Sequence, residues 1–220
     1  VAFFQNMLIG DLRGSYGKLL VAPVSLKQTL LRLIDGEIAR GDRGRIILKT
    51  NAVTERELID KLAEASQAGV RVDLIVRGIC CLRAGVPGLS ENISVRSIVG
   101  NFLEHSRIFY FLNDNSPEVY MGSADWMPRN LDRRVEIMFP VEDEKLKEQV
   151  IHILEVELED NVKAHMLQPD GTYEKEDKRG KVLVNSQEQF CREAMDLAKE
   201  HRRTDDPSVT RIFKPIESST

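Results

Sequence analysis

A strand–helix–strand succession in the first half of the chain is the feature that most restricts the fold. RIILKT (45–50) is a short apolar run, and VRVDLIVRG follows at 70–78. Residues 54–68 have the apolar spacing of a helix that ends at Gly69, with Thr54 and Glu57 placed as a capping box. A helix between two buried strands indicates parallel strands joined by a right-handed crossover. The predicted fold class is therefore α/β.

The flanking segments extend this unit into a mixed sheet flanked by helices. Apolar residues at helical spacing predict a helix that Ser25 caps and Gly41 ends. The turn sequence NDNS between two apolar runs predicts an antiparallel hairpin. We expect further strands at residues 19–23, 93–99, 107–112, 117–123 and 133–141, and a long helix over residues 143–167 with a possible break near Asp160.

Changes in composition divide the chain into four parts. Residues 1–18 are expected to be the remnant of a preceding linker or domain, and residues 19–170 the α/β domain. Residues 171–205 form a polar connector and a C-terminal helical extension that begins at Ser186, and residues 206–220 a flexible tail. Since the chain does not begin with Met, we expect it to be a piece of a longer polypeptide.

The composition favours a cytoplasmic protein without a membrane span. The chain has no run of 18 apolar residues, and its start has no signal-peptide cleavage pattern. Its three cysteines, Cys80, Cys81 and Cys191, form neither a disulfide framework nor a zinc site. The net charge of −4 provides no general attraction for nucleic acid. Binding of an anion must therefore depend on a local cluster of cations.

Every Lys or Arg position between Leu62 and Glu144 is an arginine. A guanidinium binds phosphate or carboxylate through a two-pronged, permanently charged group, which suits oxyanion recognition. Arg77 closes the run LIVRG at the carboxyl end of a predicted parallel strand, where α/β sheets bind ligands. Acidic residues share this stretch, so ion pairing, or a solvated Arg at a strand end, is the alternative interpretation.

A second group of polar residues begins at His105, just before a predicted strand. Imidazole is the side chain best suited to move a proton near pH 7, and Arg107 lies on the same face of an extended chain. The other candidate residues, all within 32 residues, are Ser123, Asn130, Arg134 and Glu136. Together they predict an oxyanion site with an imidazole and an orienting carboxylate. A purely structural or exposed His105 is the alternative.

Several of these motifs resemble known families. His105 with Arg107, followed by GSAD, resembles half of a phospholipase D-type site, with Arg in place of Lys and Asp125 where Asn is frequent. The stretches LIVRGICCLRAGVPGLSENI, SIVGNFLEHSRIFYF and YMGSADWMPRNLDRRVEIMFPV resemble the C-terminal domain of bacterial polyphosphate kinase of the two-histidine type. The resemblance runs from about Leu19 to Ala198 and implies a phospholipase D-like mixed sheet.

The resemblance also implies a function and its site residues. The family transfers the terminal phosphate of ATP reversibly to inorganic polyphosphate, with Mg²⁺ and with a phosphohistidine in an upstream domain that this chain lacks. By resemblance, His105 matches a histidine that faces the phosphorylated one, Arg77 matches an arginine that binds the ATP phosphates, and Arg134 and Glu136 match residues lining the same tunnel. Together with the residue pattern above, we expect catalysis by His105 and Glu136 and no metal ligand in this chain. We expect ATP or phosphate to be bound by Arg77, His105, Arg107, Ser123, Asn130 and Arg134.

The resemblance implies that the partners are ATP or ADP, inorganic polyphosphate and the upstream domains of the same polypeptide. We expect the full-length enzyme to be a homo-oligomer and not to bind nucleic acid. The isolated chain is expected to be inactive. Two other functions remain open. A phospholipase D-like phosphodiesterase half-site, completed by homodimerisation, would use His105 as nucleophile. A non-catalytic module that binds polyphosphate or nucleotide would keep its phosphate affinity without His105.

Other side chains are predicted to be structural. The helical face made by Ile151, Ile153, Leu154 and Leu158 should pack on the sheet, with His152 and His165 solvated or capping. Trp126 should be buried against the sheet.

Overall fold

The computed structural model describes residues 2–12, 14 and 16–203. The strands in chain order are β1 (Leu20–Ala22), β2 (Arg45–Thr50), β3 (Arg71–Val76), β4 (Ile93–Ile98), β5 (Ile108–Phe111), β6 (Glu118–Gly122), β7 (Glu136–Pro140), β8 (Ala164–Leu167) and β9 (Tyr173–Lys175). The helices are α1 (Ala2–Leu8), α2 (Leu26–Ile38), α3 (Arg56–Gln67), α4 (Glu144–Glu159) and α5 (Ser186–Arg203), with short helical turns η1 (Gly41–Arg43) and η2 (Arg129–Arg133).

These strands form a single mixed sheet in the order β1-β7-β6-β5-β2-β3-β4-β8-β9. β2 and β3 are parallel, as the sequence predicts, and β4 also runs parallel to β3. β5, β6 and β7 alternate in direction beside β2. The chain therefore leaves β2, β3, β4 and β6 and enters β5 and β7 at one edge of the sheet. The predicted mixed α/β fold is confirmed.

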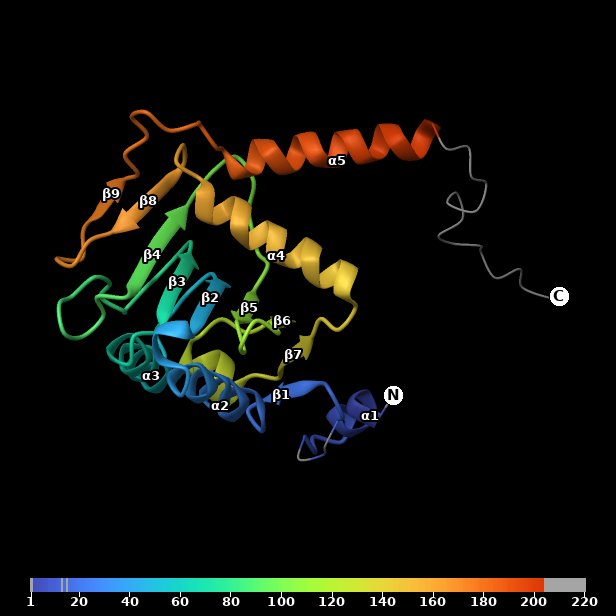
Figure 1. The fold of residues 1–220 in the computed structure, drawn as a ribbon. Coiled ribbons are helices and arrows are strands. Elements are labelled where there is room, and N and C mark those ends of the chain that lie inside the picture. The colour runs from blue at the N-terminus through green and yellow to red at the C-terminus, as the bar shows by residue number, and fades with distance from the viewer. Residues whose placement is uncertain (1, 13, 15, 204–220) are drawn as a thin grey trace.

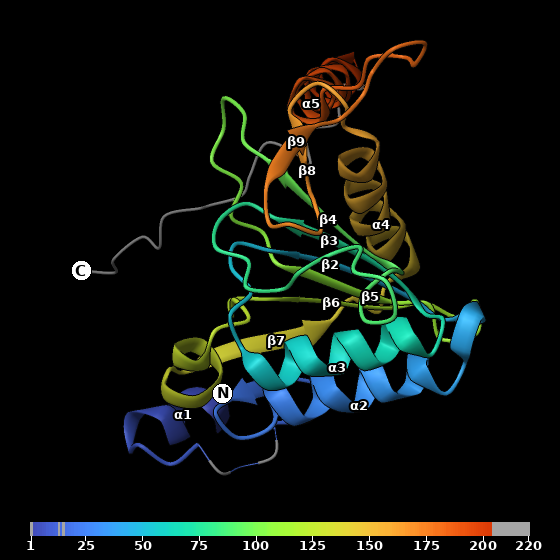
Figure 2. The ribbon, with the colours of Figure 1, turned by 90° about the vertical axis from the view of Figure 1, so that its left-hand side faces the viewer.

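Helices cover both faces of the sheet (Figures 1 and 2). α2 and α3 pack on one face over the larger hydrophobic core. α4 covers the opposite face, where Val150 and Leu154 are buried and Ile151, Ile153 and Leu158 pack at the margin. The predicted apolar face of this helix is confirmed.

The predicted long helix is wrong beyond α4. Asp160 ends the helix because its Oδ1 accepts hydrogen bonds from the backbone N–H groups of residues 162–164. The chain then forms β8, which pairs antiparallel with β4, so His165 lies on a strand. The expected connector contains β9, which pairs with β8. The break near Asp160 and the terminal helix α5 are confirmed.

The predicted capping box of α3 is also wrong. The helix begins at Arg56 with Glu55 as its N-cap and has no side-chain cap. The backbone N–H groups of Thr54 and Glu55 instead donate to the carbonyl oxygen of Trp126, at 2.7 and 2.9 Å. Ser25 precedes α2 but makes no side-chain cap either. The Trp126 carbonyl oxygen therefore accepts from the Thr54 N–H, the role that the capping box assigns to Glu57.

Two predicted side-chain environments are confirmed. Trp126 is fully buried and stacks on Phe109, with 6.0 Å between ring centroids. His152 is exposed and its Nε2 lies 3.1 Å from Glu193 Oε1. Within the described ranges, no helix is both long enough and apolar enough to span a membrane. The predicted tail, residues 206–220, lies outside the described residues.

Candidate active site

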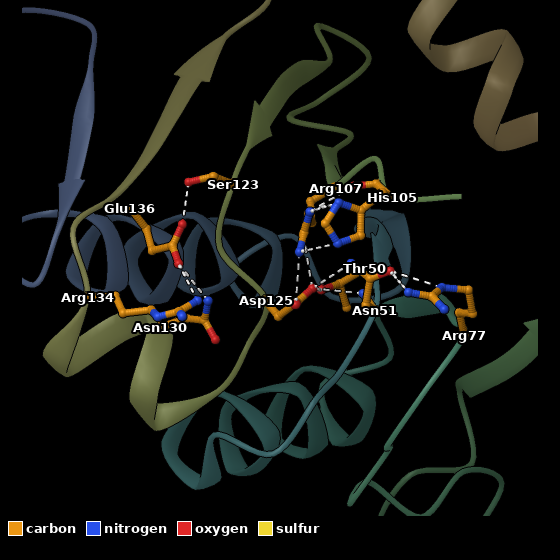
Figure 3. Close-up of polar contacts among 10 residues, drawn as sticks. All are labelled: Thr50, Asn51, Arg77, His105, Arg107, Ser123, Asp125, Asn130, Arg134 and Glu136. Carbon is orange, nitrogen blue, oxygen red and sulfur yellow. Dashed lines mark hydrogen bonds and ion pairs between the residues drawn. The ribbon is translucent and has the colours of Figure 1, made fainter. Parts of the chain in front are cut away.

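The candidate residues lie at the sheet edge where parallel strands end (Figure 3). Arg77 follows β3, and Ser123 follows β6. His105 and Arg107 precede β5, and Glu136 is the first residue of β7. Since β5 and β7 run opposite to β3 and β6, their starts lie beside the ends of the parallel strands. The topology therefore brings together residues that are up to 59 positions apart in the sequence.

Asp125, in the segment after β6, is the centre of a hydrogen-bond network. Its Oδ1 accepts from Thr50 Oγ1 at 2.9 Å and from the Asn51 backbone N and Nδ2 at 2.9 and 3.0 Å. Arg107 donates Nε to Oδ1 at 3.1 Å and Nη2 to Oδ2 at 3.0 Å. Burial opposes ionisation of this carboxyl, but the donors, Arg107 first, hold the pKa of Asp125 below its ordinary value.

Asn51 extends this network to Arg77. The Asn51 Oδ1 atom accepts from Arg77 Nε at 3.1 Å and from Nη2 at 2.8 Å. In the part of the chain that the structure describes, Arg77 makes no ion pair, so its Nη1 group can still bind an anion. Arg77 also lines a cavity of about 10 Å³, roughly the size of one water, together with Lys49, Glu104 and Glu157.

His105 is exposed and lies against the guanidinium of Arg107. Arg107 Nη1 donates to the His105 carbonyl oxygen at 2.8 Å and lies 3.1 Å from Nδ1, while Nη2 lies 3.2 Å from Nε2. A neutral imidazole has only one acceptor nitrogen, so at most one ring contact is a hydrogen bond. Arg107, itself held by Asp125, therefore sets the position of the imidazole.

A second group surrounds Glu136, which is buried. Its Oε1 accepts from Asn130 Nδ2 at 2.7 Å, and Ser123 donates its hydroxyl to Oε2. Arg134 is exposed, with Nη1 4.0 Å from Glu136 Oε1. The strand predicted from residue 133 begins only at Glu136, since Arg133 belongs to η2. Arg134 therefore precedes the strand, in extended backbone.

The segment after β6 serves both groups, since Ser123 contacts Glu136 and Asp125 contacts Arg107. Among the described residues, no hydrogen bond or ion pair joins the Arg77–His105 network directly to the Glu136 group. The sequence interpretation included members of both groups but did not assign Asn51 or Asp125 to the site. The available signals were that Asn51 directly follows a predicted strand and that Asp125 ends the GSAD motif.

The carboxylates of this site do not fit a metal ion. Asp125 and Glu136 already accept hydrogen bonds from neighbouring side chains. Nor do the described ranges contain a group of three or more His, Cys, Asp or Glu side chains placed to hold a metal. An external anion fits better, because Arg77 and the exposed Arg134 offer guanidinium groups at the edge.

Solved structures first define the class of the fold. A phospholipase D family member, Nuc from Salmonella typhimurium, aligns with 68% of this chain and 96% of its own, with a TM-score of 0.51 and 17% identity. The fold is therefore phospholipase D-like. The crystal structure of polyphosphate kinase from Porphyromonas gingivalis aligns with 90% of this chain, with a TM-score of 0.84 and 38% identity, and the match covers 31% of that protein.

Sequence comparison identifies the family. The model of the polyphosphate kinase C-terminal domain 2 matches residues 19–187, and the chain belongs to this family. The polyphosphate kinase of Thermosynechococcus vestitus is 56% identical over 172 residues, and that of Pseudomonas aeruginosa is 55% identical over 161 residues. These matches cover 76% and 72% of this chain but 24% and 23% of the relatives. The chain thus spans about a quarter of the length of these relatives, and the predicted resemblance is confirmed.

Proposed function

We propose that this chain is the part of a polyphosphate kinase that binds phosphate and supplies an acid/base histidine. The reaction is the reversible transfer of the terminal phosphate of ATP to inorganic polyphosphate. The observation that carries the proposal is the continuous series of contacts from Arg77 through Asn51, Asp125 and Arg107 to His105. This series of contacts fixes the Arg77 guanidinium, which can still bind an anion, relative to the exposed His105 imidazole.

The roles of these side chains follow from the demands of phosphoryl transfer. The reaction needs mainly positioning and neutralisation of charge on the phosphate oxygens. Arg77 and Arg134 are placed to bind those oxygens, and His105 exchanges a proton with the leaving oxygen of the diphosphate. Arg107 contacts Asp125 and His105 through its N–H groups, so we assign it to orienting His105. Glu136 lies within 4.0 Å of Arg134, and we propose that it orients that guanidinium.

The upstream domains complete the site in this proposal. They supply the remainder of the nucleotide site and the histidine whose free imidazole attacks the terminal phosphorus of ATP in line, from the side opposite His105. That histidine becomes phosphorylated as the bond to the ADP oxygen breaks and ADP leaves. When bound, Mg²⁺ neutralises charge on the transferred phosphate, and its ligands lie outside this chain. The proposal also includes a homo-oligomeric full-length enzyme that acts in the cytoplasm.

The test uses a polyphosphate kinase of full family length that carries this domain. After reaction with ATP, mass spectrometry should locate a phosphohistidine upstream and none at His105. The variant His105→Ala should stay folded and lose turnover by about 10²–10⁴-fold, as expected for removal of an acid/base group. The control is His152→Ala, because His152 is an exposed histidine on α4 whose Nε2 contacts Glu193 of α5. A phosphohistidine at His105 would support the phosphodiesterase alternative, and full turnover in His105→Ala would refute the proposed role.

A further inference from the structure

The segment that carries His105, residues 99–106, has no regular secondary structure. It lies between the end of β4 and the start of β5. Among the described residues, no backbone–backbone hydrogen bond joins it to another part of the chain. Its apolar side chains Val99, Phe102 and Leu103 are exposed, so burial does not hold it either. The position of His105 therefore depends on side chains that reach this segment from elsewhere.

Gln187, the second residue of α5, makes three hydrogen bonds to this segment. Its Oε1 accepts from the Phe102 backbone N at 3.0 Å, and its Nε2 donates to the Phe102 carbonyl oxygen at 2.9 Å. Nε2 also donates to Glu104 Oε1 at 2.8 Å. A Cβ at Gly100 would lie 2.2 Å from Gln187 Oε1, so this approach requires glycine there. Gln187 is buried, which makes the loss of these bonds costly.

Glu104 attaches the same segment to β2 and, through Lys49, to α4. Its Oε2 pairs with Lys49 of β2, and Lys49 also pairs with Glu157 of α4. Lys49 and Glu157 are almost completely buried. Burial, reinforced by the hydrogen bond with Glu104, raises the pKa of Glu157 to about 8. At neutral pH Glu157 therefore keeps its proton, and the carboxyl groups of Glu104 and Glu157 both contact the Lys49 ammonium.

The start of α5 is itself fixed in place. Asp160, which ends α4, accepts hydrogen bonds at Oδ2 from the backbone N and the Oγ of Ser186, both at 2.8 Å. Asp160 is fully buried. Gln187 thus reaches the histidine segment from a helix whose first residue is joined to α4.

We propose that Gln187 is a positioning residue for phosphoryl transfer: by binding Phe102 and Glu104 it keeps His105 against Arg107 at the sheet edge. The inference rests on the proposed function of His105 and deepens it. This role for Gln187 adds α5 to the elements that shape the site, although none of the proposed phosphate-binding residues lies on α5.

Two variants in the full-length enzyme test this role. Gln187→Ala removes the three hydrogen bonds, whereas Gln187→Glu keeps the size of the side chain but places a carboxylate against Glu104. Both should lower kcat by about 10–100-fold, because small displacements of reacting groups cost this much, while the KM for ATP changes little. The matched control is Gln189→Ala, since the Gln189 side chain bonds Glu193 within α5. Its kcat should equal that of the wild type.

Hydrogen exchange separates positioning from general loss of structure. In both Gln187 variants the amide of Phe102, which donates to Gln187 Oε1 in the wild type, should exchange faster, with β2 and β3 unchanged. Unchanged exchange of the Phe102 amide, or faster exchange with a normal kcat, would overturn the inference. If Gln187→Ala does not fold, Gln187→Glu decides the question. Normal turnover in His105→Ala would refute the proposed function instead, while the exchange measurement would still show whether Gln187 holds the segment.

Discussion

Arg107 and Asp125 form an ion pair, with Nη2 3.0 Å from Oδ2, that joins the segment before β5 to the segment after β6. The side chains are only 11% and 14% exposed. Asp125 also binds Asn51, so the pair connects the ends of three neighbouring strands. Loss of one partner would leave the other poorly solvated and unpaired, which costs more than the pair itself contributes.

We therefore expect Asp125→Asn to lower the free energy of unfolding by about 1–3 kcal/mol. The amide cannot accept from Thr50, Asn51 and Arg107 as the carboxylate does. Urea denaturation measures the change. The control Asp60→Asn alters an exposed ion pair with Arg56 at 3.5 Å and should cost less than about 0.5 kcal/mol. Equal effects of the two substitutions would contradict the importance of the buried pair.

Arg77→Lys should damage activity although it keeps the positive charge. Lysine cannot donate two N–H groups to Asn51 while a third binds phosphate. We expect kcat/KM for ATP in the full-length enzyme to fall by about 10–100-fold, the value of one charged hydrogen bond. Arg83→Lys is the matched control, because Arg83 donates Nε and Nη2 to the Pro169 carbonyl oxygen away from the site. Similar losses in both variants would argue against phosphate binding by Arg77.

The buried Glu157 should make stability fall with rising pH. Its pKa is raised from 4.5 to about 8, so between these values the folded state holds a proton that the unfolded state releases. The free energy of unfolding then decreases by at most about 1.4 kcal/mol per pH unit. Hydrogen bonds lower the pKa of Glu104 against the effect of burial, so Glu104 contributes stability that is lost only in acid, below pH 4.5. Lys49 is the cation that contacts the Glu157 carboxyl group, whereas Arg96 donates to the backbone carbonyl oxygen of Glu157.

Urea titrations at several pH values between 5 and 8 measure this slope. Glu157→Gln removes the titrating proton and should flatten it. Glu155→Gln, at an exposed position of the same helix, should retain the slope of the wild type. A slope that is the same in all three proteins would show that Glu157 does not titrate in this range.

We expect Trp126 to stabilise the fold and not to bind the nucleotide. Its ring is fully buried on Phe109, and its Nε1 has no hydrogen-bond partner among the described residues. Trp126→Phe keeps an aromatic ring and removes the unpaired N–H, so we expect a cost of only about 1 kcal/mol. Trp126→Ala should cost about 3–5 kcal/mol, measured by urea denaturation. A loss of ATP binding by Trp126→Phe at normal stability would reverse this assignment.

The sequence by itself determined the strands of the central sheet and the apolar face of α4. RIILKT and VRVDLIVRG are too apolar to be exposed, and the helical segment between them permits only a parallel crossover. Arg77 could be placed at the ligand-binding edge because it follows a predicted parallel strand. His105 precedes its strand, and it reaches the same edge only because β5 runs antiparallel to β2. These inferences need only periodicity, strand boundaries and the rule that parallel strands end at a common edge.

The tertiary structure alone decided which polar groups meet. Asp125 binds Thr50 from 75 residues away, and Lys49 meets Glu157 across 108 residues. Similarly, the segment AHML became β8 because β4 offered an edge to pair with, although its spacing continued that of α4. Hydrophobic periodicity is a local property and is visible in the sequence. Hydrogen bonds and ion pairs between distant segments depend on sheet register and on burial, which only the folded chain defines.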